Sequence, residues 1–361
     1  MLPESSHVHI DPRQVTFLTT NTCTAKCDHC SVHSSPTRRG ALTSKQMNET
    51  IDQLNREGRL RVVIFAGGEP TLLGNELLET IAYADSLGLI TRMITNAHWA
   101  TSFQVARERL LVLREAGLRE LNISCDDYHI PYIPIKRVKH AWQATRGMGF
   151  DAVVIASATG EKSKWTPKAI QALLEEPVEL FFDSNGRGRS EIPVTDGSLR
   201  VISNSQVSRI GRGAVKIGAD QVRLPKRQAE LDVPCKWIGG SPAVSPENHL
   251  LSCCGMEAAG RNHLDYGELS GNSVETLLRR AEKDLIVQAL ALIGPFRLMK
   301  LLQRLEPTVD FWPAYSAVCE VCAHIFERPE VVKLLEKHAD TLSTVVRIAS
   351  NTSTNRARMN Q

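Results

Sequence analysis

The first half of the chain alternates apolar segments of strand length with amphipathic segments of helix length, and this alternation limits the possible folds most strongly. The apolar segments are Val15–Leu18, Arg61–Ala66, Leu89–Thr95, Glu120–Ser124, Ala152–Ile155 and Val178–Phe182. Helical spacing is clearest in Met47, Ile51 and Leu54, which follow the capping-box pair Thr43 and Gln46. Strands that alternate with helices form parallel sheets with right-handed crossovers. The sequence therefore predicts an α/β fold of six βα units, whose strand ends gather polar residues at one edge.

A loop with three cysteines follows the first predicted strand. Cys23, Cys27 and Cys30 form a CxxxCxxC pattern. Iron–sulfur clusters are normally held by four cysteines, so three thiolates leave one iron open to another ligand. A zinc site is the alternative, because zinc also binds Cys-x-x-Cys pairs. For zinc, His33 is the candidate fourth ligand, whereas His29 lies between two of the cysteines and is badly placed.

The strand Arg61–Ala66 ends in two glycines and an acidic residue, Gly67, Gly68 and Glu69. Glycines at a strand end let a ligand approach the backbone closely, and the carboxylate can hold an ammonium group. Together with the cysteine loop, this motif resembles the signature of the radical S-adenosylmethionine superfamily. The resemblance implies a partial (β/α)6 TIM-like barrel and an electron-driven cleavage of S-adenosylmethionine to a 5′-deoxyadenosyl radical. It assigns the amine of the cosubstrate to the open iron and to the Gly-Gly-Glu strand, and places His29 near the adenine.

The same resemblance assigns the first cofactor site. It implies a [4Fe–4S] cluster held by Cys23, Cys27 and Cys30. Asn96 ends one predicted strand, and Ser124 and Asp126 end the next. Short polar residues there also start turns, which is the competing explanation for each of them. The resemblance favours cosubstrate binding, with Ser124 and Asp126 on the ribose hydroxyls, whereas the intervening Cys125 is predicted to be a buried thiol.

A second group of cysteines lies in the last third of the chain. Cys319 and Cys322 form a CxxC pair, and Cys235 with one of the neighbours Cys253 and Cys254 completes a set of four. Four thiolates suit a closed [4Fe–4S] cluster or a structural zinc ion. Beside the first site we expect an auxiliary [4Fe–4S] cluster on Cys235, Cys253, Cys319 and Cys322. The arrangement resembles the SPASM-type auxiliary domain of radical enzymes that modify ribosomally made peptides, with too few cysteines for two auxiliary clusters.

The spare thiol of this group carries the most specific functional expectation. Adjacent strand residues point to opposite faces, so Cys253 can bind a cluster while Cys254 faces the active site. This resembles radical peptide epimerases, and implies that Cys254 is catalytic: it returns a hydrogen atom to a Cα radical and converts an L-residue to its D form. Alternatively, Cys254 is itself a ligand or an inert thiol. The competing functions are radical peptide crosslinking (thioether or C–C) and a non-catalytic iron–sulfur electron carrier.

The domain boundaries follow from composition. A Gly-, Arg- and Ser-rich stretch begins at Ser184. Arg212 then lies in a segment that resembles the end of the barrel in members with an auxiliary domain, and is predicted to pair with an acidic group or bind a carboxylate. We predict a barrel over residues 1–215, an auxiliary-cluster domain over 216–349, and a disordered polar tail over 350–361.

Bulk properties exclude several classes of protein. The net charge of +3 is too small to indicate a nucleic-acid partner. The N-terminus lacks the features of a signal peptide, and the apolar segment Leu285–Leu302 is too interrupted to span a membrane. Nine cysteines in two dense groups favour metal binding in a reducing compartment. We expect a cytoplasmic enzyme whose partners are a precursor peptide and an electron donor such as flavodoxin or ferredoxin.

Overall fold

A parallel sheet forms the centre of the computed structural model, which describes residues 8–176, 178–181, 194–195, 197–256 and 258–359. Its parallel strands are β1 (Gln14–Leu18), β2 (Val62–Ala66), β3 (Ile90–Thr95), β4 (Glu120–Ser124), β5 (Ala152–Thr159), β6 (Glu179–Phe181) and β8 (Ser198–Gln206). They lie side by side in the order β1-β2-β3-β4-β5-β8-β6. The short β7 (Val194–Thr195) pairs antiparallel with β8. The predicted α/β class with a parallel sheet is confirmed.

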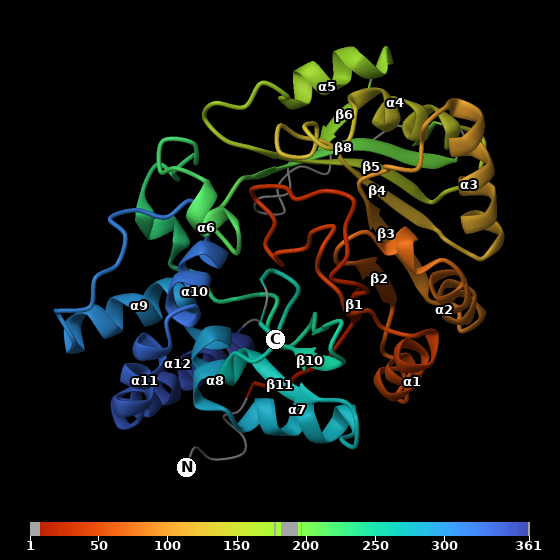
Figure 1. The fold of residues 1–361 in the computed structure, drawn as a ribbon. Coiled ribbons are helices and arrows are strands. Elements are labelled where there is room, and N and C mark those ends of the chain that lie inside the picture. The colour runs from red at the N-terminus through yellow and green to blue at the C-terminus, as the bar shows by residue number, and fades with distance from the viewer. Residues whose placement is uncertain (1–7, 177, 182–193, 196, 257, 360–361) are drawn as a thin grey trace.

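Helices cover the outer side of the curved sheet (Figure 1). They are α1 (Ser44–Leu54), α2 (Asn75–Ser86), α3 (Phe103–Glu115), α4 (Ile135–Ala144) and α5 (Pro167–Leu174), with a short 3-10 helix, η2, at Pro70–Leu73. The predicted capping box of Thr43 and Gln46 starts α1. Phe17 and Phe65 are fully buried and pack as stacked rings on neighbouring strands. This core holds β1 and β2 rigidly, and the loops that carry the first cysteines and the two glycines follow directly from their ends.

The sixth position of the sheet differs from the prediction. Val178–Phe182 was expected to be the last strand of the barrel, but it contributes only β6, at the outer edge, and Phe182 lies outside the described residues. The position beside β5 is taken by β8, which pairs with β5 along its whole length. Its residues mix apolar and polar types, with Asn204 and Gln206 near its end, so the segment lacks the regular apolar spacing that predicts a strand.

The sheet continues into the last third of the chain. β9 (Ala243–Val244) pairs parallel with β1, and β10 (His249–Leu251) and β11 (Asp265–Glu268) extend the sheet by antiparallel pairing. β9 and β10 form a hairpin that leads directly to Cys253. One sheet therefore joins the barrel to the region that holds the second cysteine group.

The C-terminal helices pack together beside the open edge of the barrel (Figure 1). They are α6 (Gly213–Lys216), η3 (Gln228–Leu231), η4 (Asn262–Leu264), α7 (Val274–Lys283), α8 (Leu285–Leu292), α9 (Gly294–Leu305), α10 (Val318–Phe326), α11 (Pro329–Lys337) and α12 (Ala339–Met359). The tail predicted as disordered over 350–361 is helical through Met359, as part of α12; the last two residues lie outside the described range. Among the described helices none is long and apolar enough to span a membrane by itself; only the bent pair α8 and α9 passes that test jointly.

Candidate active site with two adjoining cysteine cavities

A cavity of about 460 Å³ opens where the parallel strands end. The structure brings together here most of the residues predicted for the first cofactor site. They are Cys23, Cys27, His29, Cys30, Gly67, Gly68, Asn96 and Ser124. Glu69 and Asp126 are almost completely buried and stand behind this wall. The strand order alone explains the gathering, because the carboxyl ends of neighbouring parallel strands share one edge.

The two glycines make room for the cysteine loop. The amide of Gly68 donates to the carbonyl oxygen of Thr20 at 2.7 Å, and the amide of Glu69 donates to that of Thr22 at 3.0 Å. A Cβ atom on Gly68 would lie 2.1 Å from the Thr22 oxygen, and Gly67 has a φ of 116°. Glycine is therefore required at both positions by close backbone packing and by a left-handed conformation. Both glycines were expected to admit a ligand; in the structure they admit the cysteine loop, and the role toward a ligand stays a prediction.

Arg212 fastens the same loop from the other side. Its guanidinium donates to the carbonyl oxygens of Cys27 and Ser34, each at 2.6 Å, and its amide donates to the carbonyl of Cys30 at 3.0 Å. Among the described residues Arg212 has no acidic partner, so the expected pairing with an acidic neighbour is wrong, whereas binding of a carboxylate stays a prediction. Its partners are backbone carbonyls, which a sequence pattern does not reveal.

Glu69 connects the ends of β2 and β3. Its Oε1 accepts hydrogen bonds from the hydroxyls of Thr71 and Thr95 at 2.7 and 2.8 Å, and its Oε2 accepts one from the amide of Asn96 at 2.9 Å. The Asn96 side chain then donates to the hydroxyl of Thr24 at 3.1 Å and lies 3.5 Å from the Cys23 sulfur. Glu69 thus positions Asn96 against the cysteine loop. One lone pair of Oε2 remains for a further donor.

Two histidines share the buried carboxylate of Asp126. The Nδ1 atom of His129 lies 2.9 Å from Oδ1, and the Nε2 atom of His29 lies 3.5 Å from Oδ2. Burial alone would raise the pKa of Asp126, but the two histidines hold it well below its ordinary value. Burial alone would lower the pKa of His129, but Asp126 and Cys27 raise it well above its ordinary value. The His29 ring also stacks on Tyr128, with centroids 4.7 Å apart.

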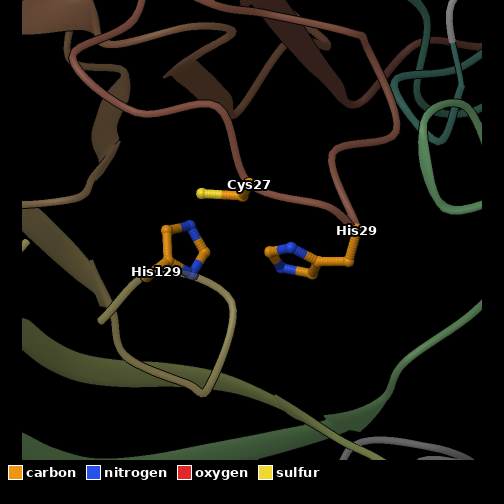
Figure 2. Close-up of side chains that lie close together, drawn as sticks. All are labelled: Cys27, His29 and His129. Atoms are coloured by element: carbon orange, nitrogen blue, oxygen red, sulfur yellow. The ribbon is translucent and has the colours of Figure 1, made fainter. Parts of the chain in front are cut away.

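Figure 2 shows Cys27, His29 and His129 facing one another, with their donor atoms within 4.8 Å. Such a group has the donors for a single metal ion, but metal ligands must be deprotonated. The raised pKa of His129 favours a protonated ring, and its Nδ1 is already bound to Asp126. The arrangement therefore fits hydrogen bonding of the histidines around Cys27 better than coordination of an ion by all three.

The compact group of possible ligand atoms among the described residues combines one cysteine with two histidines. No three cysteine sulfurs there lie within 4.8 Å of one another, whereas Zn–S bonds of about 2.3 Å would set them about 3.8 Å apart. A cubane has its irons at separate corners and accepts wider spacing. Burial raises the pKa of the Cys23 thiol to about 12, with smaller contributions from Glu69 and the other two thiols. Such thiols need a cationic group to become thiolates, so the donor set fits an iron–sulfur cluster.

A second cavity, of about 260 Å³, is lined by all five cysteines of the last third. A Cβ atom on Gly255 would lie 3.8 Å from the Cys253 sulfur and 4.0 Å from the Cys319 sulfur. Burial, together with a smaller contribution from neighbouring thiols, raises the pKa of Cys253 to about 12 and that of Cys319 to about 11. Five thiols around one cavity include the four that a closed [4Fe–4S] cluster or a structural zinc ion would require.

The two cavities adjoin at Cys319 and Gly255, which line both of them. Cys254 lines the second cavity. The residue as a whole is exposed, although the thiol lies deep enough for burial to raise its pKa. Cys254 is thus one residue away from the wall of the first cavity, and its role as hydrogen donor stays a prediction.

One wall of the first cavity comes from a segment that was not predicted to belong to the site. Ser205, Gln206, Ser208 and Ile210 come from the end of β8 and the segment after it. In the described structure the Gln206 Oε1 atom is buried without a hydrogen-bond partner, as are Ser34 Oγ and His29 Nδ1. Because buried polar atoms are normally paired, these three point to polar groups of a ligand. No local signal marked the residues of this wall, because β8 itself was not predicted from the sequence.

Comparison with known proteins gives independent information. Residues 17–149 match the family model of the Radical SAM superfamily. The chain is 21% identical over 313 residues to the "Putative peptide biosynthesis protein YydG" of Bacillus subtilis, covering 86% of this chain and 91% of that protein. It is 36% identical over 114 residues to the PqqA peptide cyclase of Rhodopseudomonas palustris, covering 31% of this chain and 28% of the cyclase. Among solved structures, BtrN in complex with AdoMet and 2-DOIA gives a TM-score of 0.49 at 12% identity, covering 80% of this chain and 91% of BtrN.

Proposed function

On the premise that residues 17–149 are a radical S-adenosylmethionine domain, we propose that this chain is an enzyme that modifies a ribosomally synthesised peptide. The observation that carries the proposal is the gathering of Cys23, Cys27 and Cys30 at one cavity that adjoins a second cysteine cavity. A peptide substrate is supported by the similarity to YydG along most of its length and, over a shorter region, to a peptide cyclase. An electron carrier would need one such cavity and no cosubstrate wall.

In this proposal the residues divide between two cofactor sites. Cys23, Cys27 and Cys30 hold a [4Fe–4S] cluster, and residues 1–215 form the domain around it. When bound, that cluster with its open iron supplies an electron to S-adenosylmethionine and thereby a 5′-deoxyadenosyl radical. Residues 216–349 form the auxiliary domain, whose cluster is held by Cys235, Cys253, Cys319 and Cys322. A flavodoxin or ferredoxin delivers the electrons.

The side chains around the first cavity orient the cosubstrate. Glu69 Oε2 offers a remaining lone pair to the methionyl ammonium, beside the Asn96 amide that it already accepts. The hydroxyl of Ser124 lines the cavity and binds the ribose. Asp126 acts indirectly, by orienting the two histidines, because its oxygens already contact His29, His129 and backbone amides. The unpaired Nδ1 of His29 is placed to bind the adenine.

We further propose that the modification is epimerisation. The 5′-deoxyadenosyl radical would take a hydrogen atom from the substrate Cα and become 5′-deoxyadenosine, which leaves a carbon radical, and Cys254 would give the hydrogen atom of its S–H bond to the opposite face. The sulfur is left as a thiyl radical, and one electron with one proton restores the thiol. Each turnover therefore takes one electron for cosubstrate cleavage and one for the thiol. Five cysteines around a cavity that needs four ligands support a spare thiol of this kind.

Peptide crosslinking is the second candidate, and one observation favours it. Cys254 is not among the described residues that line the first cavity, where a hydrogen donor must act. A crosslinking enzyme needs no such donor. It removes two hydrogen atoms from its substrate, so the mass of the product distinguishes the two reactions.

The first prediction tests the cofactor assignment. Replacing Cys23, Cys27 and Cys30 together by Ala removes the only three thiolates of the loop. We expect the reconstituted protein to fall from about eight irons to about four, as expected for two cubanes and one. Formation of 5′-deoxyadenosine should be abolished. Iron and sulfide analysis measures the cluster content, and chromatography measures the 5′-deoxyadenosine formed. Undiminished cleavage by this variant would refute the assignment, and four irons with one zinc in the parent would make the second site structural.

The second prediction tests the hydrogen donor. For Cys254→Ala we expect full iron content, continued cosubstrate cleavage and loss of D-residue formation. The measurement is incubation with S-adenosylmethionine and peptide in D2O: the parent adds one deuterium to the product, whereas crosslinking removes two hydrogens. Cys319→Ala is the comparison, since Cys319 also reaches the first cavity. If Cys254→Ala loses iron, Cys254 is a ligand rather than the donor. The variant that then keeps its iron, Cys253→Ala or Cys319→Ala, identifies the thiol that is free to act as donor.

A further inference from the structure

A buried ion pair joins the wall of the first cavity to the helix of the second cysteine group. Glu320 lies between Cys319 and Cys322 on α10 and is completely buried. Its Oε1 accepts from the Nε atom of Arg209 at 2.7 Å and from the Arg209 amide at 2.8 Å. Its Oε2 accepts from the amide of Ser316 at 2.5 Å. Both carboxylate oxygens are thus used inside the protein.

The partner, Arg209, is equally committed. Its Nη2 donates to the carbonyl oxygen of Ala314 at 2.7 Å, and its guanidinium lies 3.9 Å from the ring centroid of Trp312. Trp312 in turn stacks on His324 of α10, with centroids 4.1 Å apart. Arg209 therefore holds both the start of α10, through Glu320, and the segment that leads into it.

The sequence neighbours of this pair form the two cavities. Ser208 and Ile210 line the first cavity on either side of Arg209. Cys319 precedes Glu320 and lines both cavities. A hydrogen bond of 3.3 Å between the hydroxyls of Ser316 and Ser208 links the same two segments as the ion pair. The Arg209–Glu320 contact therefore fixes the distance and angle between the wall after β8 and the Cys319 thiol.

Stability alone is a poor explanation for such a pair. Desolvation of two buried charges offsets most of their attraction, and apolar residues of similar volume are often as stable. What the pair provides is one defined geometry, since the carboxylate meets its donors at fixed points and the guanidinium is planar. We propose that Arg209 and Glu320 are positioning residues that hold α10 against the first cavity and place Cys319 at its wall.

The test uses two conservative variants of the full-length, reconstituted protein. Glu320→Gln keeps the shape and one acceptor oxygen but removes the charge, and Arg209→Lys keeps the charge but loses the fork and the stacking on Trp312. The matched control is Asp232→Asn, which removes another two-point pair, with Arg297 at 2.8 and 2.9 Å, on the exposed surface of the same region.

We expect both variants to exchange backbone hydrogen faster in α10 and in residues 207–212, while α1–α5 and the control remain as in the parent. We also expect 5′-deoxyadenosine to form at the parent rate, with the amount of modified peptide per 5′-deoxyadenosine lower by about tenfold or more, as misplacement at a reacting centre does. A purely structural pair would lower the two products together.

Three results would overturn the proposal: unchanged exchange in α10, faster exchange throughout the chain, or an unchanged ratio of the two products. The ratio rests on the proposed function, whereas the exchange pattern does not. If the parent modifies no peptide but the two variants still show faster exchange only in α10 and residues 207–212, the positioning role stands and the proposed function is refuted.

Discussion

Close backbone packing at single residues sets the shape of the cysteine loop. At Gly68 a side-chain carbon would enter the space of the Thr22 carbonyl, and Arg212 closes the loop from the opposite side with two charged hydrogen bonds to carbonyls. These are contacts between groups of the protein itself. They decide whether three thiols that are close in sequence also point into one cavity.

The third prediction follows from this packing. Gly68→Ala should lower the free energy of unfolding by about 1–3 kcal/mol, as overpacking does. It should also reduce the iron held at the first site, because the loop must shift away from β2. Gly240→Ala is the control, since a Cβ there meets nothing within 4 Å. Urea unfolding and iron analysis of both variants provide the measurement. Equal behaviour of the two variants would show that the loop adapts without cost.

The residues of the first site were predictable because their signal is local. A three-cysteine spacing and a Gly-Gly-Glu strand end can be seen in a few residues each. The partners of Arg212 and the burial of Asp126 behind two histidines depend on which segments meet in space, and the sequence carries no pattern for them. The acidic partner expected for Arg212 was therefore wrong, while Cys125 is fully buried as predicted.

At the scale of elements, His263 ties three segments of the C-terminal region together. It lies in η4, with Nδ1 2.6 Å from Asp284, the residue that caps α8, and Nε2 3.2 Å from Glu336 on α11. Burial alone would lower the pKa of His263, but the two carboxylates raise it above its ordinary value. The protonated ring is therefore the form that the folded protein prefers.

The fourth prediction is the pH dependence of this contact. Since the pKa is higher in the folded than in the unfolded chain, the stabilisation is complete below the ordinary value of 6.5 and is lost as the pH rises through the raised value. We expect His263→Gln to cost about 1–2 kcal/mol on the acidic side and less on the alkaline side. His9→Gln, at an exposed pair with Glu282, is the control. Urea unfolding at several pH values measures it; a pH-independent difference would contradict the assignment.

Elements with a regular period were predictable, and irregular ones were not. The first five strands and the helices between them follow their apolar spacing closely. β8 escaped detection because polar residues interrupt its apolar pattern; two of them, Ser205 and Gln206, line the first cavity. The polar composition of residues 350–361 suggested disorder, but composition does not report the continuation of α12, which begins at Ala339 and is anchored by buried residues such as Leu342 and Val346.

At the scale of the whole molecule, the two functional regions share a sheet. The proposed boundary at residue 215 leaves β1 on one side and its neighbour β9 on the other. The amide of Thr16 donates to the carbonyl of Pro242 at 3.1 Å, and the Asn21 side chain donates to Glu247 at 2.6 Å. The cysteine loop of the first region thus rests directly on the hairpin of the second.

The fifth prediction follows from this pairing. A chain that ends at residue 215 exposes the edge of β1 and the apolar surface beneath the hairpin, and unpaired edges of this kind aggregate. We expect it to be insoluble or to elute as aggregates in size-exclusion chromatography. Removal of residues 353–361 alone should leave the protein soluble and monodisperse. A soluble, compact 1–215 fragment that binds four irons would show that the barrel folds independently.

The continuous sheet also bears on how such proteins are recombined. A substrate-specific C-terminal region would be exchanged between relatives as a module only if few contacts crossed its border, as at ordinary linkers. Here a border at residue 215 crosses the main-chain pairing of β1 with β9. A border in residues 269–273, between β11 and α7, crosses no strand pair but separates Arg209 from Glu320 and His263 from Asp284. Chimeras joined at either border should therefore fold poorly, and we expect relatives to inherit the two regions together.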